Sequence, residues 1–107
     1  MAKALLKIPK TAKKGEIITL SAIFSHPMEA GYRRDMEGQA VPRDIISLFT
    51  CNYDGAEVFR ADLFPAISAY PLMSFTTIAT VSGPIIFTWT DEKGKTWTET
   101  AEIAVEG

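Results

Sequence analysis

Cysteine and histidine are almost missing from this 107-residue sequence, which has only Cys51 and His26. A single cysteine excludes a disulfide within the chain and any metal site built from several cysteines. A blue-copper centre needs two histidines, so the chain cannot form one alone. A serine or cysteine nucleophile would have only His26 as its base. We therefore expect no catalytic residues, no metal and no cofactor, and we favour a binding role over an enzymatic one.

A large excess of charge of one sign is also missing, since eleven basic and thirteen acidic residues give a formal net charge of -2. This balance predicts no general attraction to nucleic acid or to anionic lipid. Basic residues gather only ahead of Glu16, where no arginine or aromatic residue lies between them. We interpret them as the solvent side of a first strand and its following turn rather than as a nucleic-acid patch. They are Lys3, Lys7, Lys10, Lys13 and Lys14.

Long apolar runs are absent as well. No stretch approaches the roughly 20 apolar residues that cross a bilayer, so we expect a soluble chain without membrane insertion. Lys3 and Lys7 interrupt the first apolar residues before they reach the about 7 residues that a secretion signal needs. This sequence therefore predicts no signal peptide of its own.

Alternating apolar and polar residues dominate what is present, in a chain that is 47% hydrophobic and 22% charged. Ile18, Leu20, Ala22 and Phe24 form one apolar face, opposite a mixed one, which is typical of a half-buried strand. We expect one domain over residues 1–107 with an all-β fold, an immunoglobulin-like antiparallel β-sandwich of about seven strands. The strands are predicted near residues 2–8, 16–25, 44–53, 56–63, 74–82, 85–90 and 96–105.

Two further local signals support this prediction. Asp54-Gly55 lies between two predicted strands and indicates a tight hairpin, because both central residues of such a turn need a positive φ. Ile85, Phe87 and Trp89 alternate along one strand and are predicted to be core. Cys51 is predicted to face the same side as Ile45, Ser47 and Phe49, so a buried, inert thiol is favoured over a reactive one.

Two long connections separate the predicted strands. The first, residues 26–43, contains Glu29, Asp35 and Glu37, which could bind a hard cation; because Arg33 and Arg34 lie among them, an internally paired, solvated loop is the better interpretation. The second, residues 64–74, is apolar for a loop and either folds over the core or forms a patch for a partner. Its apolar side chains include Phe64, Ile67, Tyr70, Leu72 and Met73.

Several multi-residue blocks, in order along nearly the whole chain, resemble the SoxZ family of the bacterial sulfur-oxidation system. The blocks are Ser25–Glu29 with Gly31, Arg33 and Arg34, then Val41–Ile46, Phe49–Cys51, Tyr53–Gly55, Glu57–Asp62, Pro65–Ala69 and finally Phe87, Trp89 and Asp91.

The resemblance implies an immunoglobulin-like, noncatalytic subunit that forms a heterodimer with SoxY, the protein that carries sulfur compounds in thiosulfate oxidation. It also implies transient contacts with other Sox enzymes, and a periplasmic location reached by co-export with the signal-bearing SoxY. A small thiol or redox protein acting through Cys51 remains the alternative.

Two sets of candidate site residues follow. Aromatic residues and methionine are enriched in interface cores, so we expect a partner interface of apolar loop residues with a polar rim on the adjoining strand. It comprises Phe64, Ile67, Tyr70, Leu72 and Met73, with Arg60 and Asp62 as the rim. A guanidinium pairs well with sulfonate-like anions, so a second set is a candidate contact for the carrier arm or its enzymes. This set is His26, Glu29, Arg33 and Arg34, and the alternative is that both arginines pair with loop carboxylates to hold the loop's shape.

Overall fold

Strands form all the regular structure of the computed structural model, which describes residues 4–25, 28, 34, 36–39, 44–63 and 72–107. No helix occurs in these ranges, and the all-β prediction is confirmed. The strands are β1 (Ala4–Lys7), β2 (Thr11–Lys13), β3 (Ile17–Phe24), β4 (Ile46–Tyr53), β5 (Ala56–Asp62), β6 (Leu72–Ile78), β7 (Gly83–Asp91) and β8 (Thr96–Glu106).

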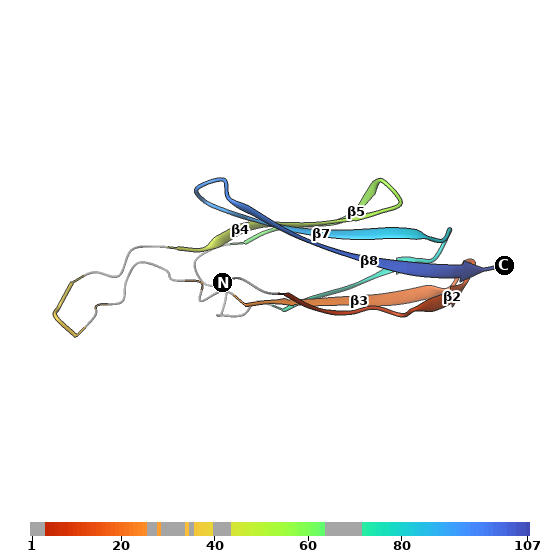
Figure 1. The fold of residues 1–107 in the computed structure, drawn as a ribbon, viewed down its shortest axis with the longest axis horizontal. Helices are drawn as coiled ribbons and strands as arrows, with labels where there is room; N and C mark the ends of the chain where they lie inside the picture. The colour runs from red at the N-terminus through yellow and green to blue at the C-terminus, as the bar shows by residue number, and fades with distance from the viewer. Residues whose placement is uncertain (1–3, 26–27, 29–33, 35, 40–43, 64–71) are drawn as a thin grey trace.

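The strands form two stacked sheets, which Figure 1 shows as two layers. One sheet has three strands in the order β1-β3-β6, and the other has five in the order β2-β8-β7-β4-β5. Neighbouring strands are antiparallel, apart from β2 and β8, which are parallel. This is the immunoglobulin-like sandwich that the alternation predicts.

The N-terminal segment differs from the prediction, because the strand expected over residues 2–8, which is β1, is followed by a second strand, β2, that was not expected. The pairing with β3 ends at Lys7, two residues before Pro9, which has no N–H to extend the ladder. Lys10 then accepts a hydrogen bond from the N–H of Ala104 at 3.0 Å, and β2 pairs with β8 of the other sheet. The expected turn after the first strand is therefore wrong for residues 11–13, although Lys7, Lys10, Lys13 and Lys14 are exposed as expected, and the described strands number eight.

The core lies between the sheets and is rich in aromatic rings. Ile18, Leu20, Ala22 and Phe24 are buried, which confirms the apolar face predicted for β3. Trp89 is 0% exposed, and its ring stacks on Phe24 with centroids 4.7 Å apart. The prediction that Ile85, Phe87 and Trp89 are core residues is therefore confirmed.

Strand β4 contains an irregularity that the alternation did not predict. Its register against β7 shifts between Ile46 and Leu48, so Ile46 and Phe49 are both fully buried although they are three residues apart. The sequence predicted Ser47 on the core side with Cys51, and this was wrong. Ser47 is half-buried, and its hydroxyl donates to the C=O of Thr90 at 3.3 Å. An extra residue in one strand reverses the side that each preceding side chain faces.

The hairpin between β4 and β5 has the predicted conformation. Asp54 has φ 51° and Gly55 has φ 82°, so both central residues occupy the left-handed region. The turn places β5 at the edge of the five-stranded sheet.

Candidate functional site

The outer face of the three-stranded sheet exposes apolar side chains in register. Leu5, Ile23 and Leu72 lie opposite one another on β1, β3 and β6, and they are 68%, 39% and 58% exposed. Ile17 and Ile78 form a second exposed pair at the other end of β3 and β6. Between these apolar ends lie Ser and Thr residues of β3 and β6, with Lys7 of β1 opposite Ser21, so an apolar row borders each end of a centre with a single charge.

We call this surface the neutral face. It consists of Leu5, Ile17, Thr19, Ser21, Ile23, Leu72, Ser74, Thr76 and Ile78. The hydroxyls of Ser21 and Ser74 are hydrogen-bonded to each other at 3.0 Å across β3 and β6. Lys7 is the one charged residue in the three strands, so a partner can cover this face at little cost in desolvated charge.

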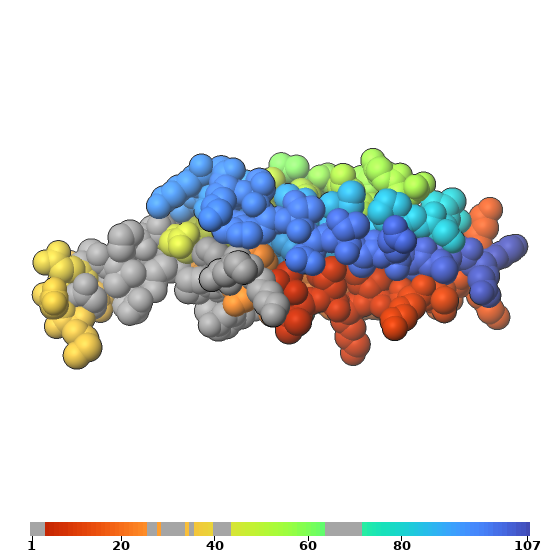
Figure 2. All heavy atoms as spheres, viewed as in Figure 1, coloured from red at the N-terminus to blue at the C-terminus, as the bar shows by residue number. Residues whose placement is uncertain are grey.

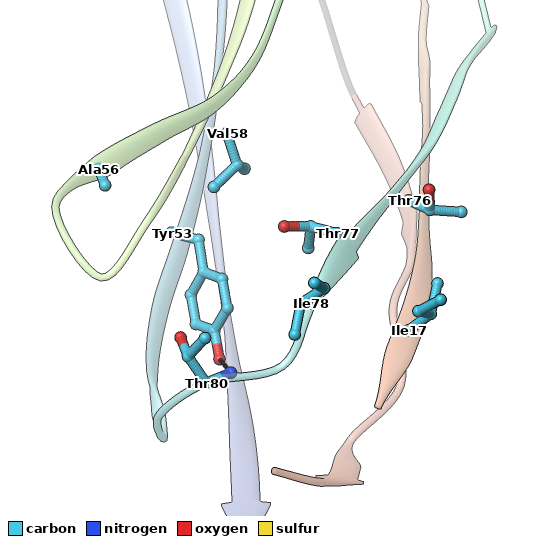
Figure 3. Close-up of a pocket in the computed structure, with 8 residues that line it drawn as sticks. All are labelled: Ile17, Tyr53, Ala56, Val58, Thr76, Thr77, Ile78 and Thr80. Carbon is cyan, nitrogen blue, oxygen red and sulfur yellow. Dashed lines mark hydrogen bonds between the residues drawn. The ribbon is translucent and has the colours of Figure 1, made fainter. Parts of the chain in front are cut away.

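A groove continues the neutral face around the edge of β6, toward the start of β5. Its volume is about 570 Å³, and it is lined by Ile17, Tyr53, Ala56, Val58, Thr76, Thr77, Ile78 and Thr80. Figure 3 shows Tyr53 and Val58 on one side and Thr77 pointing toward them from β6. None of the lining residues carries a formal charge at neutral pH, so the groove favours an uncharged occupant.

Tyr53 lines this groove and joins the two sheets. Its hydroxyl accepts hydrogen bonds from the N–H groups of Thr80 and Val81, at 3.1 and 3.2 Å, and donates to the C=O of Val81. Because Tyr53 belongs to β4 and residues 80 and 81 follow β6, these bonds tie the five-stranded sheet to the end of the three-stranded one. The opposite side of the sandwich is packed: in Figure 2, red and orange atoms of the N-terminal strands lie directly against the blue atoms of β8.

The predicted interface residues fall on different parts of the molecule. Leu72 belongs to the neutral face, whereas Met73 is half-buried and packs against the core. Arg60 and Asp62 are exposed on β5, in the other sheet, where Arg60 lies 3.6 Å from Glu57. Arg60 and Asp62 therefore belong to a different strand and sheet from Leu72, although Phe59 of the same strand β5 stacks on Phe75 of β6. The remaining members, Phe64, Ile67 and Tyr70, lie outside the described residues.

Of the predicted carrier-arm set, the structure describes Arg34 alone. Its guanidinium donates a hydrogen bond to the C=O of Gly38 at 3.0 Å, closing a short segment of the loop. His26, Glu29 and Arg33 lie outside the described residues.

Cys51 is fully buried on β4, among core residues. Burial raises the pKa of its thiol to about 12, because the charged thiolate would lose its hydration. At neutral pH the sulfur is therefore protonated and shielded, and both properties oppose nucleophilic or redox chemistry.

Sequence reasoning missed most of the neutral face and the groove. Ile17 and Ile23 stand on the side of a predicted strand opposite its apolar face, and two isoleucines on that mixed side were a usable sequence signal for a binding surface; the structure exposes both. The groove carried no comparable signal, because Val58 and Thr77 approach only after the two sheets stack.

The described residues show neither clustered metal ligands nor a membrane-spanning helix. No group of three or more histidine, cysteine, aspartate or glutamate residues is placed there to hold a metal ion. No helix in the same part of the chain has the length and apolar character to span a membrane.

The fold and surface together define an immunoglobulin-like β-sandwich with one outer sheet face that carries a single charged residue, Lys7. Residues 6–102 match the family described as Sulphur oxidation protein SoxZ, so the chain belongs to the SoxZ family and is a component of the Sox sulfur-oxidation system. This confirms the family that the sequence blocks indicated. Among curated protein sequences there is no significant match.

Solved structures with the same fold have low sequence identity. The sulfur carrier protein SoxY from Chlorobium limicola f thiosulfatophilum is 15% identical, with a TM-score of 0.67, over 97% of this chain and 79% of that one. A superoxide reductase (neelaredoxin) from Ignicoccus hospitalis is 17% identical, with a TM-score of 0.71, over 96% of this chain and 80% of that one. At these identities the likeness shows the fold alone.

Proposed function

We propose that this chain is the noncatalytic subunit that pairs with SoxY in the periplasm, forming the carrier complex for sulfur compounds in thiosulfate oxidation. Membership of the SoxZ family over residues 6–102 is the observation that carries this proposal. Residues 1–107 would act as one binding domain, and its contacts with other Sox enzymes would be transient.

The surface supports a binding role. An apolar row of Leu5, Ile23 and Leu72 is exposed on a sheet face with almost no charge, which is unusual for a chain that keeps this face in water. Burying apolar side chains of this size against a partner contributes roughly 25 cal/mol per Å² before association costs. The residues Phe64, Ile67 and Tyr70, which precede β6 in sequence, remain part of the proposed interface, with Arg60 and Asp62 as its polar rim.

The pairing is tested by titrating the purified chain with purified SoxY in a calorimeter. We expect a one-to-one complex, with affinity reduced at least tenfold when Tyr70 and Leu72 are both replaced by Ser. Thr98→Ser, on an exposed position of β8 in the other sheet, is the matched control and should bind normally. No detectable complex with the wild-type chain would contradict the proposed function itself.

The carrier-arm contact is a separate part of the proposal. His26, Glu29, Arg33 and Arg34 would face the carrier arm or its enzymes, with one arginine pairing with the anionic sulfur group. The bond from Arg34 to Gly38 gives that arginine a role in loop shape, so Arg33 is the stronger candidate for the anion. Normal sulfur turnover by the folded complex in both Arg33→Gln and Arg34→Gln, measured in the reconstituted pathway, would rule this contact out.

The competing function, thiol chemistry at Cys51, is separated by labelling. A buried thiol whose pKa is raised to about 12 should react with a thiol reagent at pH 8 only after denaturation. Rapid stoichiometric labelling of the native chain would favour the thiol protein instead.

A further inference from the structure

The four strands that end the two sheets differ in how they are protected from pairing with another strand. Exposed edges of soluble proteins usually carry charges, proline or a very short strand, because an unprotected edge is a template for a further strand. In the order of the sheets, β1, β2 and β5 each fit this rule. Strand β1 ends in Lys7; β2 has three residues and includes Lys13; β5 contains Glu57, Arg60 and Asp62.

Strand β6 is the exception. Its seven residues, Leu72–Ile78, include no charged residue, no proline and no glycine. At a rise of about 3.3 Å per residue the strand spans roughly 23 Å, which is long enough to pair with a strand of ordinary length. Within the described part of the chain, β3 is its one strand neighbour.

The hydrogen-bonding groups of β6 can be assigned to its two sides. Ala79, directly after β6, donates to the C=O of Glu16 at 2.8 Å and accepts from the N–H of Gly15 at 2.7 Å, so both of its main-chain groups face the β3 side. Main-chain groups alternate in direction along an antiparallel strand, and the register of β6 on β3 has no shift. The N–H and C=O groups of Ser74, Thr76 and Ile78 therefore point to the open side.

The surroundings of this open side select for an uncharged occupant. The groove of Figure 3 runs beside the second half of β6 and is lined by Thr, Ile, Val, Ala and Tyr side chains. A charged side chain entering it would lose hydration without an opposite charge to pair with. An extended strand of small and apolar residues would satisfy the main-chain groups and cover the exposed Ile78.

We propose that the open edge of β6 pairs with an uncharged β-strand of the SoxY partner, so that the three-stranded sheet continues across the heterodimer. This inference rests on the proposed function. A SoxY structure shares the β-sandwich fold of this chain, so a partner of that fold is built of strands and can supply one. The proposed strand lies next to Leu72, which the sequence already placed in the interface.

Thr76→Pro tests the main-chain pairing directly. Proline removes the N–H that faces the open side while leaving the bonds of β6 to β3, and edge positions of this kind tolerate it. We expect the affinity for purified SoxY, measured by calorimetric titration, to fall at least tenfold. Thr98→Lys is the matched control, because Thr98 is exposed on β8 in the other sheet; its affinity should change less than threefold. Thr19→Lys, opposite Thr76 on β3, is a separate variant that tests the neutral face. Thermal unfolding must show that all three variants are folded.

Amide hydrogen exchange gives a second readout that needs no variant. In the complex with SoxY, the amides of Ser74, Thr76 and Ile78 should exchange at least tenfold more slowly than in the free chain, whereas the amides of β2, at the other edge of the five-stranded sheet, should not change. Normal binding by folded Thr76→Pro, with these three amides unprotected, would overturn the edge pairing and leave the proposed function intact. Loss of binding in Thr19→Lys with normal binding in Thr76→Pro would assign the contact to the neutral face and overturn the edge pairing.

Two other outcomes would contradict SoxY as the occupant of this edge. Protection of the three amides in the isolated chain, increasing with its concentration, would show that a second copy of this chain occupies the edge. A wild-type chain that does not bind SoxY at all would remove the proposed function and this inference together.

Discussion

Strands β5 and β6 have seven residues each and border the same groove, but they present opposite chemistry at the edges of their sheets. Strand β5 carries Glu57, Arg60 and Asp62, whereas β6 carries no charge. Beneath this difference each strand supplies an aromatic ring to the core, since Phe59 of β5 stacks on Phe75 of β6 with ring centroids 4.3 Å apart. The comparison shows that a strand's packing in the core and its protection against pairing with a further strand are independent properties. Core packing therefore does not explain why β6 lacks charged residues.

The largest expected loss of stability comes from truncating Trp89, in the core that supports both strands. Trp89→Ala should lower the free energy of unfolding by about 3 to 5 kcal/mol, because it leaves a cavity beside Phe24 and Phe49. Trp89→Phe is the control: it keeps an aromatic ring, and it deletes an indole N–H that has no hydrogen-bond partner among the described residues, so its loss should be at most about half as large. Chemical denaturation measures both, and a loss below about 1 kcal/mol for Trp89→Ala would contradict its core role.

The next prediction compares the stability that each strand gains from its stacked ring. Phe75→Ala should cost about 3 kcal/mol, because Phe75 is buried and contacts both Phe59 and Phe49. Phe59→Ala should cost about half of that, because the ring is only partly buried. Urea denaturation of the two variants under the same conditions tests this order. Equal losses would mean that the two edges share the core contact equally.

Tyr53→Phe should open the groove between these strands at a cost of about 1 to 3 kcal/mol, since the N–H groups of Thr80 and Val81 lose their acceptor. The ring itself stays, so packing is preserved. Thermal unfolding gives the loss of stability, and amide exchange at residues 80 and 81 should become faster. If both amides keep their protection in the variant, the hydroxyl is not what ties the sheets together.

Local alternation was enough to predict which side of most strands is buried. Ile18 and Leu20 on β3, like Phe87 and Trp89 on β7, followed period-two patterns that a half-buried strand requires. The bulge at Ser47 was not visible, because nothing in that residue's neighbours marks an extra position in the ladder. The parallel pairing of β2 with β8 was also not predictable, since it joins residues some 90 positions apart through a bend at Pro9.

The candidate site was less predictable than the fold. Leu72 was found because it belongs to an apolar segment between predicted strands, and the structure places it on the neutral face. Its neighbours Leu5 and Ile23 come from two other strands, so their alignment depends on strand register rather than on local sequence. An edge without charge likewise becomes recognisable only when the order of the strands is known, because the same residues would be unremarkable in the centre of a sheet.

The smallest effect on stability tests the edge comparison most directly. Replacing the three charges of β5 together, by Glu57→Gln, Arg60→Gln and Asp62→Asn, should change the free energy of unfolding by less than about 1 kcal/mol, because the 3.6 Å ion pair of Arg60 and Glu57 is exposed. Its effect on association should be large, since a second seven-residue edge would lose its charge. We expect sedimentation velocity to show dimers or larger species of the triple variant at concentrations where the wild-type chain remains a single species. Adding Thr50→Lys, which places a new charge opposite Arg60→Gln on the neighbouring strand β4 but not on the edge, should leave this association largely in place. A triple variant that sediments like the wild-type chain would mean that charge does not protect β5, and the uncharged edge of β6 would then lose its significance as a pairing site.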